Sequence, residues 1–213
     1  HSIANIIARI LVPEGTRDVA VYDPAAGTGT LVLAAAHRIG EQNCTIYTQD
    51  RSQKANEFMR LNLILNNLVH SLPNVVHDDT LESPRHLAVG GNSIRKFDYI
   101  VSNPPFKADF SDTRNKLAGD AYQKRFWAGV PNITSKPEKM EIYLMFLQHI
   151  VASMEESGCA AMVVPTGFLT AKGKIPLAIR KRMVDEGMLR GVVSMPSNIF
   201  ANTGTNVSIV FLD

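Results

Sequence analysis

The chain has 213 residues, of which 45% are apolar and 20% charged, and its formal net charge is +2. These values are typical of a globular protein with a substantial core, and the small charge permits a nucleic-acid partner without indicating one. No apolar stretch approaches the roughly 20 residues that span a bilayer and no signal peptide opens the chain, so we expect no membrane association.

Strand and helix patterns alternate along the chain. Short apolar runs predict seven strands, at residues 19–22, 45–48, 74–76, 98–101, 159–164, 189–194 and 207–212. Helical patterns fall between them at residues 31–39, 52–65, 138–156 and 174–186, with Ser52 as the expected N-cap of the second helix. This alternation predicts an α/β fold, a mostly parallel sheet with helices on both faces, in a single domain over residues 1–213.

One segment breaks the alternation. Residues 107–137 are polar, with a Phe126-Trp127 pair and more basic than acidic side chains. A loop of this length in a compact domain is usually functional or disordered, and this one directly follows a candidate active-site motif. We therefore expect a polar loop over the active site, with a solvated loop that has no partner as the alternative.

The cysteine and histidine residues carry no pattern of a metal site. Cys44 and Cys159 lie far apart beside apolar runs, which favours buried, reduced thiols and a cytoplasmic location. The six histidines show no metal spacing, so we expect no bound metal, and His149 is expected to be a packed or capping residue rather than a base.

A glycine turn follows the first predicted strand. Asp23 ends that strand, glycines follow at 27 and 29, and Asp50 ends the next strand, where an acidic residue can hold ribose hydroxyls. Val32 stands where a dinucleotide site has its third glycine. This pattern favours a ligand with a ribose but no pyrophosphate, such as S-adenosylmethionine; a tight turn without a ligand is the alternative.

Two acidic residues, Asp78 and Asp79, follow the third predicted strand. By the same topology one of them should accept a hydrogen bond from the adenine amine of the cofactor. The alternative is a turn or N-cap pair.

The most informative motif is Asn103-Pro104-Pro105-Phe106, directly after the fourth predicted strand. Two prolines give a stiff, non-helical segment that cannot continue a sheet ladder. The Asn103 carboxamide oxygen and the Pro104 carbonyl are then available as acceptors, with an aromatic ring two residues further on. This arrangement suits a planar molecule that carries an amino group, such as a nucleobase.

In combination these motifs resemble a family, the N6-adenine DNA methyltransferases, and most closely the modification subunit of type I restriction–modification systems. The resemblance covers nearly the whole chain and lies in the tracts DPAAGTGTLV, YTQD, HDDTL, FDYIVSNPPF, VVPTGFL and RGVVSMPSNIFANTGTNVSIVFLD. It implies a Rossmann-like methyltransferase fold, S-adenosylmethionine as cofactor, a flipped DNA adenine as substrate, and separate specificity and restriction subunits as partners.

The resemblance also implies roles for individual residues. The catalytic set is Asn103, Pro104 and Phe106, and the cofactor-binding set is Asp23, Ala25, Gly27, Thr28, Gly29, Asp50, Asp79 and Thr80. Four positions depart from the usual family residues: Ala26, Thr30, Asp50 and Asp78, and the last leaves open which aspartate binds the cofactor. The family's Thr-Pro pair would precede His1, so we expect a catalytic core without the N-terminal helical domain and C-terminal tail.

Two alternatives remain open from the sequence. The same tetrapeptide could present an RNA base or a protein glutamine to the methyl donor, because these groups place the same hydrogen-bonding demand on the site. A non-catalytic assembly subunit is the second alternative, which the intact Asn103 and Phe106 disfavour.

Overall fold

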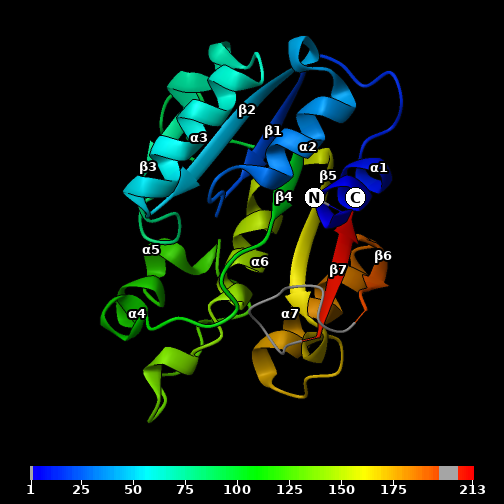
Figure 1. The fold of residues 1–213 in the computed structure, drawn as a ribbon. Coiled ribbons are helices and arrows are strands. Elements are labelled where there is room, and N and C mark those ends of the chain that lie inside the picture. Colours follow the sequence, from blue (N-terminus) through cyan, green and yellow to red (C-terminus); the bar gives the residue numbers. More distant parts are fainter. Residues whose placement is uncertain (1, 197–205) are drawn as a thin grey trace. The chain divides into compact units, whose positions relative to one another are not determined.

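Seven strands form a mostly parallel sheet in the order β3-β2-β1-β4-β5-β7-β6 (Figure 1). The structure is a computed structural model that describes residues 2–196 and 206–213. The strands are β1 (Val19–Asp23), β2 (Cys44–Asp50), β3 (Val75–His77), β4 (Phe97–Ser102), β5 (Met154–Pro165), β6 (Leu189–Ser194) and β7 (Val207–Leu212). β6 runs antiparallel to β7. The predicted seven-stranded α/β sheet is confirmed.

One helix precedes the first strand, and the others lie between strands along the chain. They are α1 (Ser2–Leu11), α2 (Thr30–Ile39), α3 (Gln53–Leu65), α4 (Ser111–Leu117), α5 (Asp120–Gln123), α6 (Tyr143–Ser153) and α7 (Lys174–Asp185). Short 3-10 turns are η1 (Glu41–Asn43), η2 (Val69–Asn74), η3 (Pro137–Lys139) and η4 (Thr166–Leu169). Over the described residues, none of these helices has the length and apolar character needed to cross a membrane.

The chain divides into two compact units. The first contains His1–Asn103 and Ser153–Ala161, and the second contains Pro104–Ala152 and Met162–Asp213. The two units are described separately below.

In the first unit, β1 lies between β2 and β4, and all three run parallel. Apolar side chains such as Val21, Ile46 and Ile100 are buried and form its core. Asp23 at the end of β1 lies opposite Thr48 of β2. Because the strands are parallel, their carboxyl ends meet at one edge of the sheet, where ligands bind in open α/β folds.

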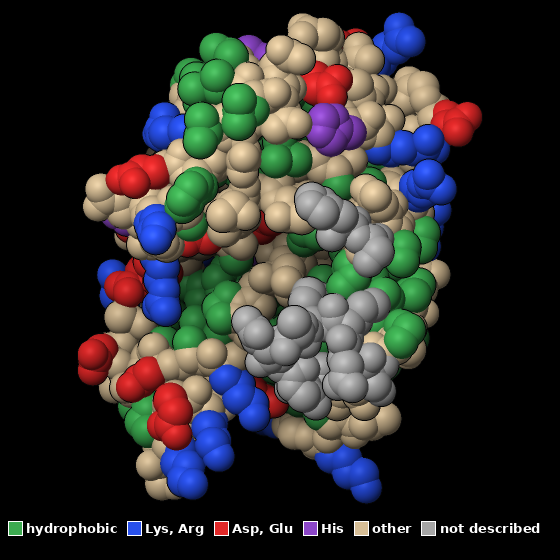
Figure 2. Space-filling model, in the orientation of Figure 1, with side chains coloured by type: hydrophobic (Ala, Val, Ile, Leu, Met, Phe, Trp, Pro, Cys, Tyr) green, Lys and Arg blue, Asp and Glu red, His purple; other side chains and the backbone are tan. Residues whose placement is uncertain are grey.

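The helix α3 follows β2 and begins as the sequence predicts. The Ser52 hydroxyl accepts a hydrogen bond from the Ala55 N–H at 3.2 Å, which confirms the expected N-cap. One helix face is buried through Asn56, Met59 and Leu63. Apolar side chains also gather on its outer face (Figure 2), where Phe58, Leu61, Ile64 and Leu65 are exposed.

The predicted helix at residues 138–156 is shorter in the structure. α6 covers Tyr143–Ser153, and β5 begins at Met154 rather than at residue 159. The polar residues at 155–157 resemble a helix end in sequence, but they form the exposed start of the strand. At Gly158 a side chain would collide with the Phe97 carbonyl, so this close approach of two strands requires glycine.

In the second unit, the polar segment at residues 107–137 is not a loop throughout. It contains α4 and α5 and has its own apolar anchors, of which Phe110, Leu117 and Phe126 are buried. These few apolar residues are widely spaced among polar ones, so the sequence pattern alone did not predict the two helices.

Candidate active site

Asp23 ends β1 and is the most buried of the predicted site residues that carry a charge. Its side chain is 2% exposed, and its Oδ1 accepts a hydrogen bond from the Ala25 N–H at 2.9 Å. Burial raises the pKa of this carboxyl to about 7, against the lowering effect of the bonds to Ala25 and Ser102, and the nearby Asp50 carboxylate raises it further. A carboxyl with this pKa can be neutral or charged near neutrality, depending on what lies next to it.

The two glycines of the turn after β1 have different surroundings. Both have a positive φ, +53° at Gly27 and +90° at Gly29. A side chain at Gly29 would collide with Sδ of Met59 on α3, so Met59 would have to move, and the φ of +90° strains any other residue at this position. A side chain at Gly27 would meet no atom within 4 Å. Gly27 therefore faces open space, and this is where a ligand can approach the backbone.

Thr28, between the two glycines, is exposed, and its carbonyl accepts a hydrogen bond from Asn62 Nδ2 at 2.8 Å. Asn62 lies one helical turn from Met59, so the same face of α3 contacts Thr28 and Gly29. The sequence analysis did not identify Asn62, because its role depends on which face α3 presents to a turn more than 30 residues earlier in the chain.

Asp50 ends β2 and holds the glycine turn. Its Oδ2 accepts the Gly27 N–H at 2.8 Å, and its Oδ1 accepts the Ser52 N–H at 2.8 Å. Each carboxylate oxygen has about two lone-pair sites, so each can accept one further hydrogen bond. Asp50 can therefore order the turn and still receive the hydroxyl groups of a ligand.

The residues after β3 are bonded mainly within their own turn. Asp78 pairs with Arg85 at 2.6 Å through Oδ2 and accepts the Asp79 N–H through Oδ1. Asp79 Oδ1 accepts the N–H groups of Leu81 and Glu82 at 2.8 and 3.2 Å. The turn expected as the alternative is thus present. These bonds use Oδ1 of Asp79. Within the described part of the chain, Oδ2 of Asp79 accepts none of them.

Thr80 has a role in holding two loops together. It is 4% exposed, and its hydroxyl donates to the Pro24 carbonyl at 2.7 Å. This bond ties the turn after β3 to the turn after β1. Thr80 therefore stabilises the positions of these two turns relative to each other.

The tetrapeptide that begins at Asn103 leaves β4 at the same edge of the first unit. Ser102 is the last buried residue of the strand, and Asn103 is exposed. Pro104 is buried and Pro105 is exposed, so Pro104 anchors the chain just beyond Asn103. The Asn103 carboxamide thus does not pack into the core. The carboxyl ends of three adjacent parallel strands therefore carry four of the predicted site residues: Asp23, Gly27, Asp50 and Asn103.

Phe106 belongs to the second unit and is half-buried. Its ring contacts Tyr143 of α6, with the ring centroids 6.4 Å apart and the planes at 78°. Tyr143 is 2% exposed and in turn contacts Phe168. Phe106 therefore has one side against a buried ring and keeps part of its surface accessible.

Polar groups of α6 hold the segment at residues 107–137. Gln148 is fully buried, and its Oε1 accepts the Ala128 N–H at 2.8 Å while its Nε2 donates to the Gly129 carbonyl at 3.0 Å. One side chain thus satisfies two backbone groups of the segment.

A second set of contacts involves the aromatic pair of this segment. The Arg125 guanidinium lies 4.3 Å from the centroid of the Phe126 ring and donates to Nδ1 of His149 at 3.4 Å. His149 is fully buried, which confirms that it is a packed residue. The Trp127 ring lies under the guanidinium of Arg182 at 4.5 Å.

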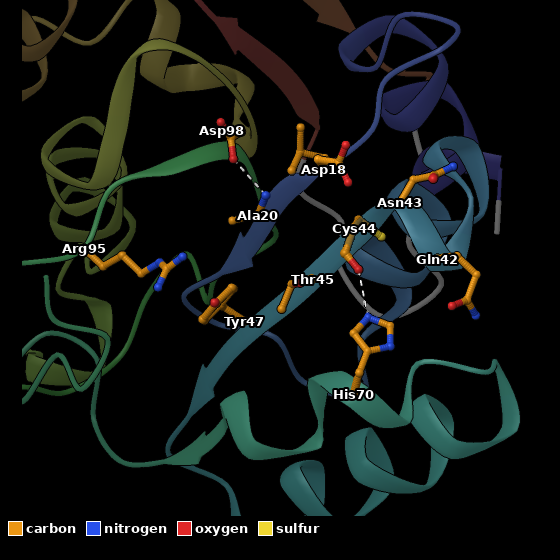
Figure 3. A pocket seen from close by; sticks show the side chains of 11 residues that line it. Asp18, Ala20, Gln42, Asn43, Cys44, Thr45, Tyr47, His70, Arg95 and Asp98 are labelled. Carbon is orange, nitrogen blue, oxygen red and sulfur yellow. Dashed lines mark hydrogen bonds between the residues drawn. The ribbon is translucent and has the colours of Figure 1, made fainter. Parts of the chain in front are cut away.

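A hollow of about 440 Å³ opens at the opposite edge of the first unit, at the amino-terminal ends of β1 and β2 (Figure 3). Arg95 stacks over the Tyr47 ring at 4.4 Å, and Asp98 accepts the Ala20 N–H at 2.8 Å. None of the predicted site residues lines it. Its lining consists of Asp18, Val19, Ala20, Gln42, Asn43, Cys44, Thr45, Tyr47, His70, Arg95 and Asp98.

The described part of the chain contains no group of three His, Cys, Asp or Glu side chains that could hold a metal ion. Neither cysteine forms a disulfide in the described part of the chain. Cys44 is buried and Cys159 half-buried, and burial raises the pKa of the Cys44 thiol to about 11. Cys44 is therefore a neutral thiol at neutral pH.

Comparison with solved structures identifies the fold class. A type I restriction–modification methyltransferase subunit from Streptococcus thermophilus superimposes with a TM-score of 0.82 at 24% identity, over 99% of this chain and 43% of that one. A putative class I S-adenosylmethionine-dependent methyltransferase from Listeria monocytogenes matches with a TM-score of 0.69 at 15% identity, over 99% of this chain and 58% of that one. The fold is that of the S-adenosylmethionine-dependent methyltransferases.

Sequence comparison narrows this class to a family. The family model described as N-6 DNA Methylase matches residues 1–213, and the chain belongs to this family. Among relatives, the type I restriction enzyme MpnII methylase subunit of Mycoplasma pneumoniae is 31% identical over all of this chain and 39% of its own length. The HindI methylase subunit of Haemophilus influenzae is 25% identical over all of this chain and 44% of its own length. The chain thus spans less than half the length of these relatives.

The closing motif noted in the sequence lies partly outside the described residues. Its residues 197–205 are not described, whereas the strand that follows, β7, is present as predicted.

Proposed function

We propose that this chain is the catalytic part of a DNA methyltransferase that transfers a methyl group from S-adenosylmethionine to N6 of adenine. The observation that carries this proposal is the exposed carboxamide of Asn103 at the carboxyl end of β4. Asn103 lies at the same edge of the sheet as the glycine turn and Asp50 of the first unit. Family membership agrees with this chemistry.

The residues at this edge fit S-adenosylmethionine. The open space at Gly27 admits a ligand close to the backbone, since a side chain there would meet no atom within 4 Å. The remaining lone pairs of Asp50 suit ribose hydroxyls, and Oδ2 of Asp79 suits an adenine amine. Asp23 suits the positively charged methionine end, because a cation next to a carboxyl favours its ionised form.

The cofactor, when bound, supplies a methyl group on a positively charged sulfur. The chain's own residues then act on the acceptor. The Asn103 carboxamide oxygen and the Pro104 carbonyl accept hydrogen bonds from the adenine amine, which localises the nitrogen lone pair toward the donor. The new N–C bond forms from that lone pair as the S–C bond breaks, and the nitrogen then releases one proton to water. Positioning and preorganised acceptors therefore supply the catalysis, and no strong base is needed.

The target adenine must leave the DNA duplex to reach Asn103, which costs a few kcal/mol in unstacking. Stacking on the Phe106 ring would offset about 1–3 kcal/mol of this unstacking free energy. Phe106 has accessible surface for such a contact, since it is only half-buried.

The relatives are methylase subunits of type I restriction enzymes. We therefore propose that this protein is the modification subunit of such a system, and that separate specificity and restriction subunits act with it. In this assignment DNA sequence recognition comes from the specificity subunit.

The test is methyl transfer from tritiated S-adenosylmethionine, by the protein as its gene encodes it together with its specificity subunit, to DNA, RNA and protein. We expect incorporation into DNA, and at least a hundredfold loss in the Asn103→Ala variant with cofactor affinity retained. Incorporation into RNA or protein but not DNA would overturn the choice of substrate. Unchanged DNA methylation in Asn103→Ala would overturn the assignment of the site.

A further inference from the structure

The ring of Phe106 is the first of three aromatic rings in contact within the second unit. Phe106 contacts Tyr143 with the centroids 6.4 Å apart, and Tyr143 contacts Phe168 with the centroids 6.0 Å apart. The ring planes cross at 78° and 88°, so both contacts are edge-to-face. This is a preferred geometry for aromatic pairs, and it fixes the direction in which each ring faces.

The far end of this series is anchored to the backbone. Arg180 of α7 donates to the Phe168 carbonyl at 2.5 Å and to the Ala171 carbonyl at 2.6 Å. Its guanidinium also lies 5.6 Å from the centroid of the Phe168 ring. One arginine therefore fixes both the turn that carries Phe168 and the ring itself, so Phe168 is a rigid support for Tyr143.

Tyr143 is the middle ring and the one that touches Phe106. It is 2% exposed, at the first position of α6, whereas Phe106 is half-buried. A half-buried phenylalanine after two prolines can change its side-chain rotamer unless a neighbour blocks the alternatives. Tyr143 lies against one side of Phe106, and part of the remaining surface of Phe106 is accessible.

The hydroxyl of Tyr143 interacts with Glu141, whereas the ring is the part of the side chain that contacts Phe106. Burial raises the pKa of the Tyr143 hydroxyl above its ordinary value, and the neighbouring Glu141 carboxylate raises it further against a smaller opposing effect of Arg180. The hydroxyl therefore stays protonated at physiological pH. The useful part of the side chain is its ring.

We propose that Tyr143 is a positioning residue that fixes the Phe106 ring in the orientation needed to stack on the methyl-accepting base. Phe168 and Arg180 support it from behind. This inference rests on the proposed function, because it assigns Phe106 as the stacking surface for the target adenine.

The test compares three variants of the protein as its gene encodes it, with its specificity subunit. Tyr143→Leu removes the ring, Tyr143→Phe keeps the ring without the hydroxyl, and Phe146→Leu removes a ring of the same helix. Phe146 is similarly buried, at 7% exposed, which makes it a matched control for the loss of packing. We expect Tyr143→Leu to lower kcat for DNA methylation by about five- to tenfold with little change in KM for DNA or in cofactor affinity.

The two other variants separate positioning from general destabilisation. Tyr143→Phe is expected to retain at least half of the wild-type kcat, and Phe146→Leu to lower the melting temperature as much as Tyr143→Leu without the loss in kcat. The inference is overturned if Tyr143→Leu keeps the wild-type kcat. It is also overturned if Tyr143→Phe loses as much as Tyr143→Leu, or if Phe146→Leu does.

A spectroscopic measurement tests the orientation of the ring without relying on methyl transfer. With 4-fluorophenylalanine at position 106, one fluorine resonance is expected in the wild type and in Tyr143→Phe. A shifted, exchange-broadened or split resonance is expected in Tyr143→Leu. Identical spectra in all three would refute the positioning role. If the wild type methylates no DNA while the spectra change as expected, the proposed function fails and the positioning of Phe106 stands.

Discussion

The backbone N–H of Gly27 donates a hydrogen bond to Oδ2 of Asp50 at 2.8 Å. This bond joins the turn after β1 to the carboxyl end of β2, and the other Asp50 oxygen caps the start of α3 through the Ser52 N–H. One carboxylate therefore sets the shape of the turn that faces the proposed cofactor. Both oxygens of Asp50 thus bond to the backbone that this side chain orders.

Substitution of Asp50 by Asn should weaken cofactor binding. The amide has one oxygen, so either the Gly27 or the Ser52 N–H loses its acceptor, at a cost of about 1–3 kcal/mol. We expect the affinity for S-adenosylmethionine, measured by titration calorimetry, to fall about ten- to a hundredfold. Asp185→Asn is the matched control, because it breaks an exposed ion pair with Lys181 and should change affinity very little. Equal affinity in the Asp50→Asn protein and the wild type would refute this role.

The two glycines of the turn should respond differently to alanine. Gly29→Ala forces a side chain against Met59 at a φ of +90°, so it should lower the melting temperature by several degrees. Gly27→Ala meets no atom, so its folding cost should be limited to the roughly 1–2 kcal/mol of a left-handed alanine. It should nevertheless reduce cofactor affinity more than Gly29→Ala does, because its methyl group enters the open space. The reverse order of affinities would contradict this account.

Asp23 should make the folded state less stable as the pH rises toward neutrality. Its pKa in the folded protein is about 7, above the ordinary value of 3.8, so between these values the folded state holds a proton that the unfolded state has lost. The free energy of unfolding should therefore fall between pH 4 and pH 7, by at most about 4 kcal/mol from this group. Urea unfolding of wild type and Asp23→Asn at pH 5 and pH 8 measures this, and the variant should show a flatter profile. Parallel profiles would show that another group is responsible.

Cofactor binding should have the opposite pH dependence. A positively charged ligand next to Asp23 favours the ionised carboxyl, so binding below pH 7 requires the release of a proton. The affinity for S-adenosylmethionine should fall up to about tenfold per unit of pH below 7 in the wild type. In Asp23→Asn this dependence should be absent, and the comparison cancels the titration of the ligand itself. The same pH dependence in Asp23→Asn as in the wild type would exclude this carboxyl as its source.

Gln148 should control the order of the segment at residues 107–137. Gln148→Leu leaves the Ala128 N–H and the Gly129 carbonyl without their partner, at a cost of about 1–3 kcal/mol. Hydrogen exchange should then become faster in this segment, with little change in the first unit. Gln123→Leu is the matched control, since Gln123 is exposed and bonds to the exposed Asp120 side chain in its own short helix. Equal rates of hydrogen exchange at residues 107–137 in Gln148→Leu and Gln123→Leu would contradict the role of Gln148.

The strands and the glycine turn were predictable because they depend on local patterns. Apolar runs such as Val19–Asp23 are followed by turn residues, and the cap at Ser52 is set by its own next three residues. The position of Asn103 directly after the end of β4 was predictable for the same reason, since the two prolines that follow it cannot continue a strand.

Other features depend on contacts between distant residues, and the sequence pattern did not reveal them. The bond between Gly27 and Asp50 joins positions 23 residues apart, and Gly158 is required only because the Phe97 carbonyl lies against it. The contact of Tyr143 with Phe106 also arises only when α6 packs beside the tetrapeptide. Such roles follow from packing and not from composition.

The identity of the methylated base tests the central claim most directly. DNA methylated by the protein with its specificity subunit is digested to nucleosides and analysed by mass spectrometry. We predict N6-methyldeoxyadenosine as the product, lost in Asn103→Ala although that variant still binds S-adenosylmethionine. A methylated cytosine in place of adenine, or N6-methyldeoxyadenosine at wild-type levels from Asn103→Ala, would contradict the account.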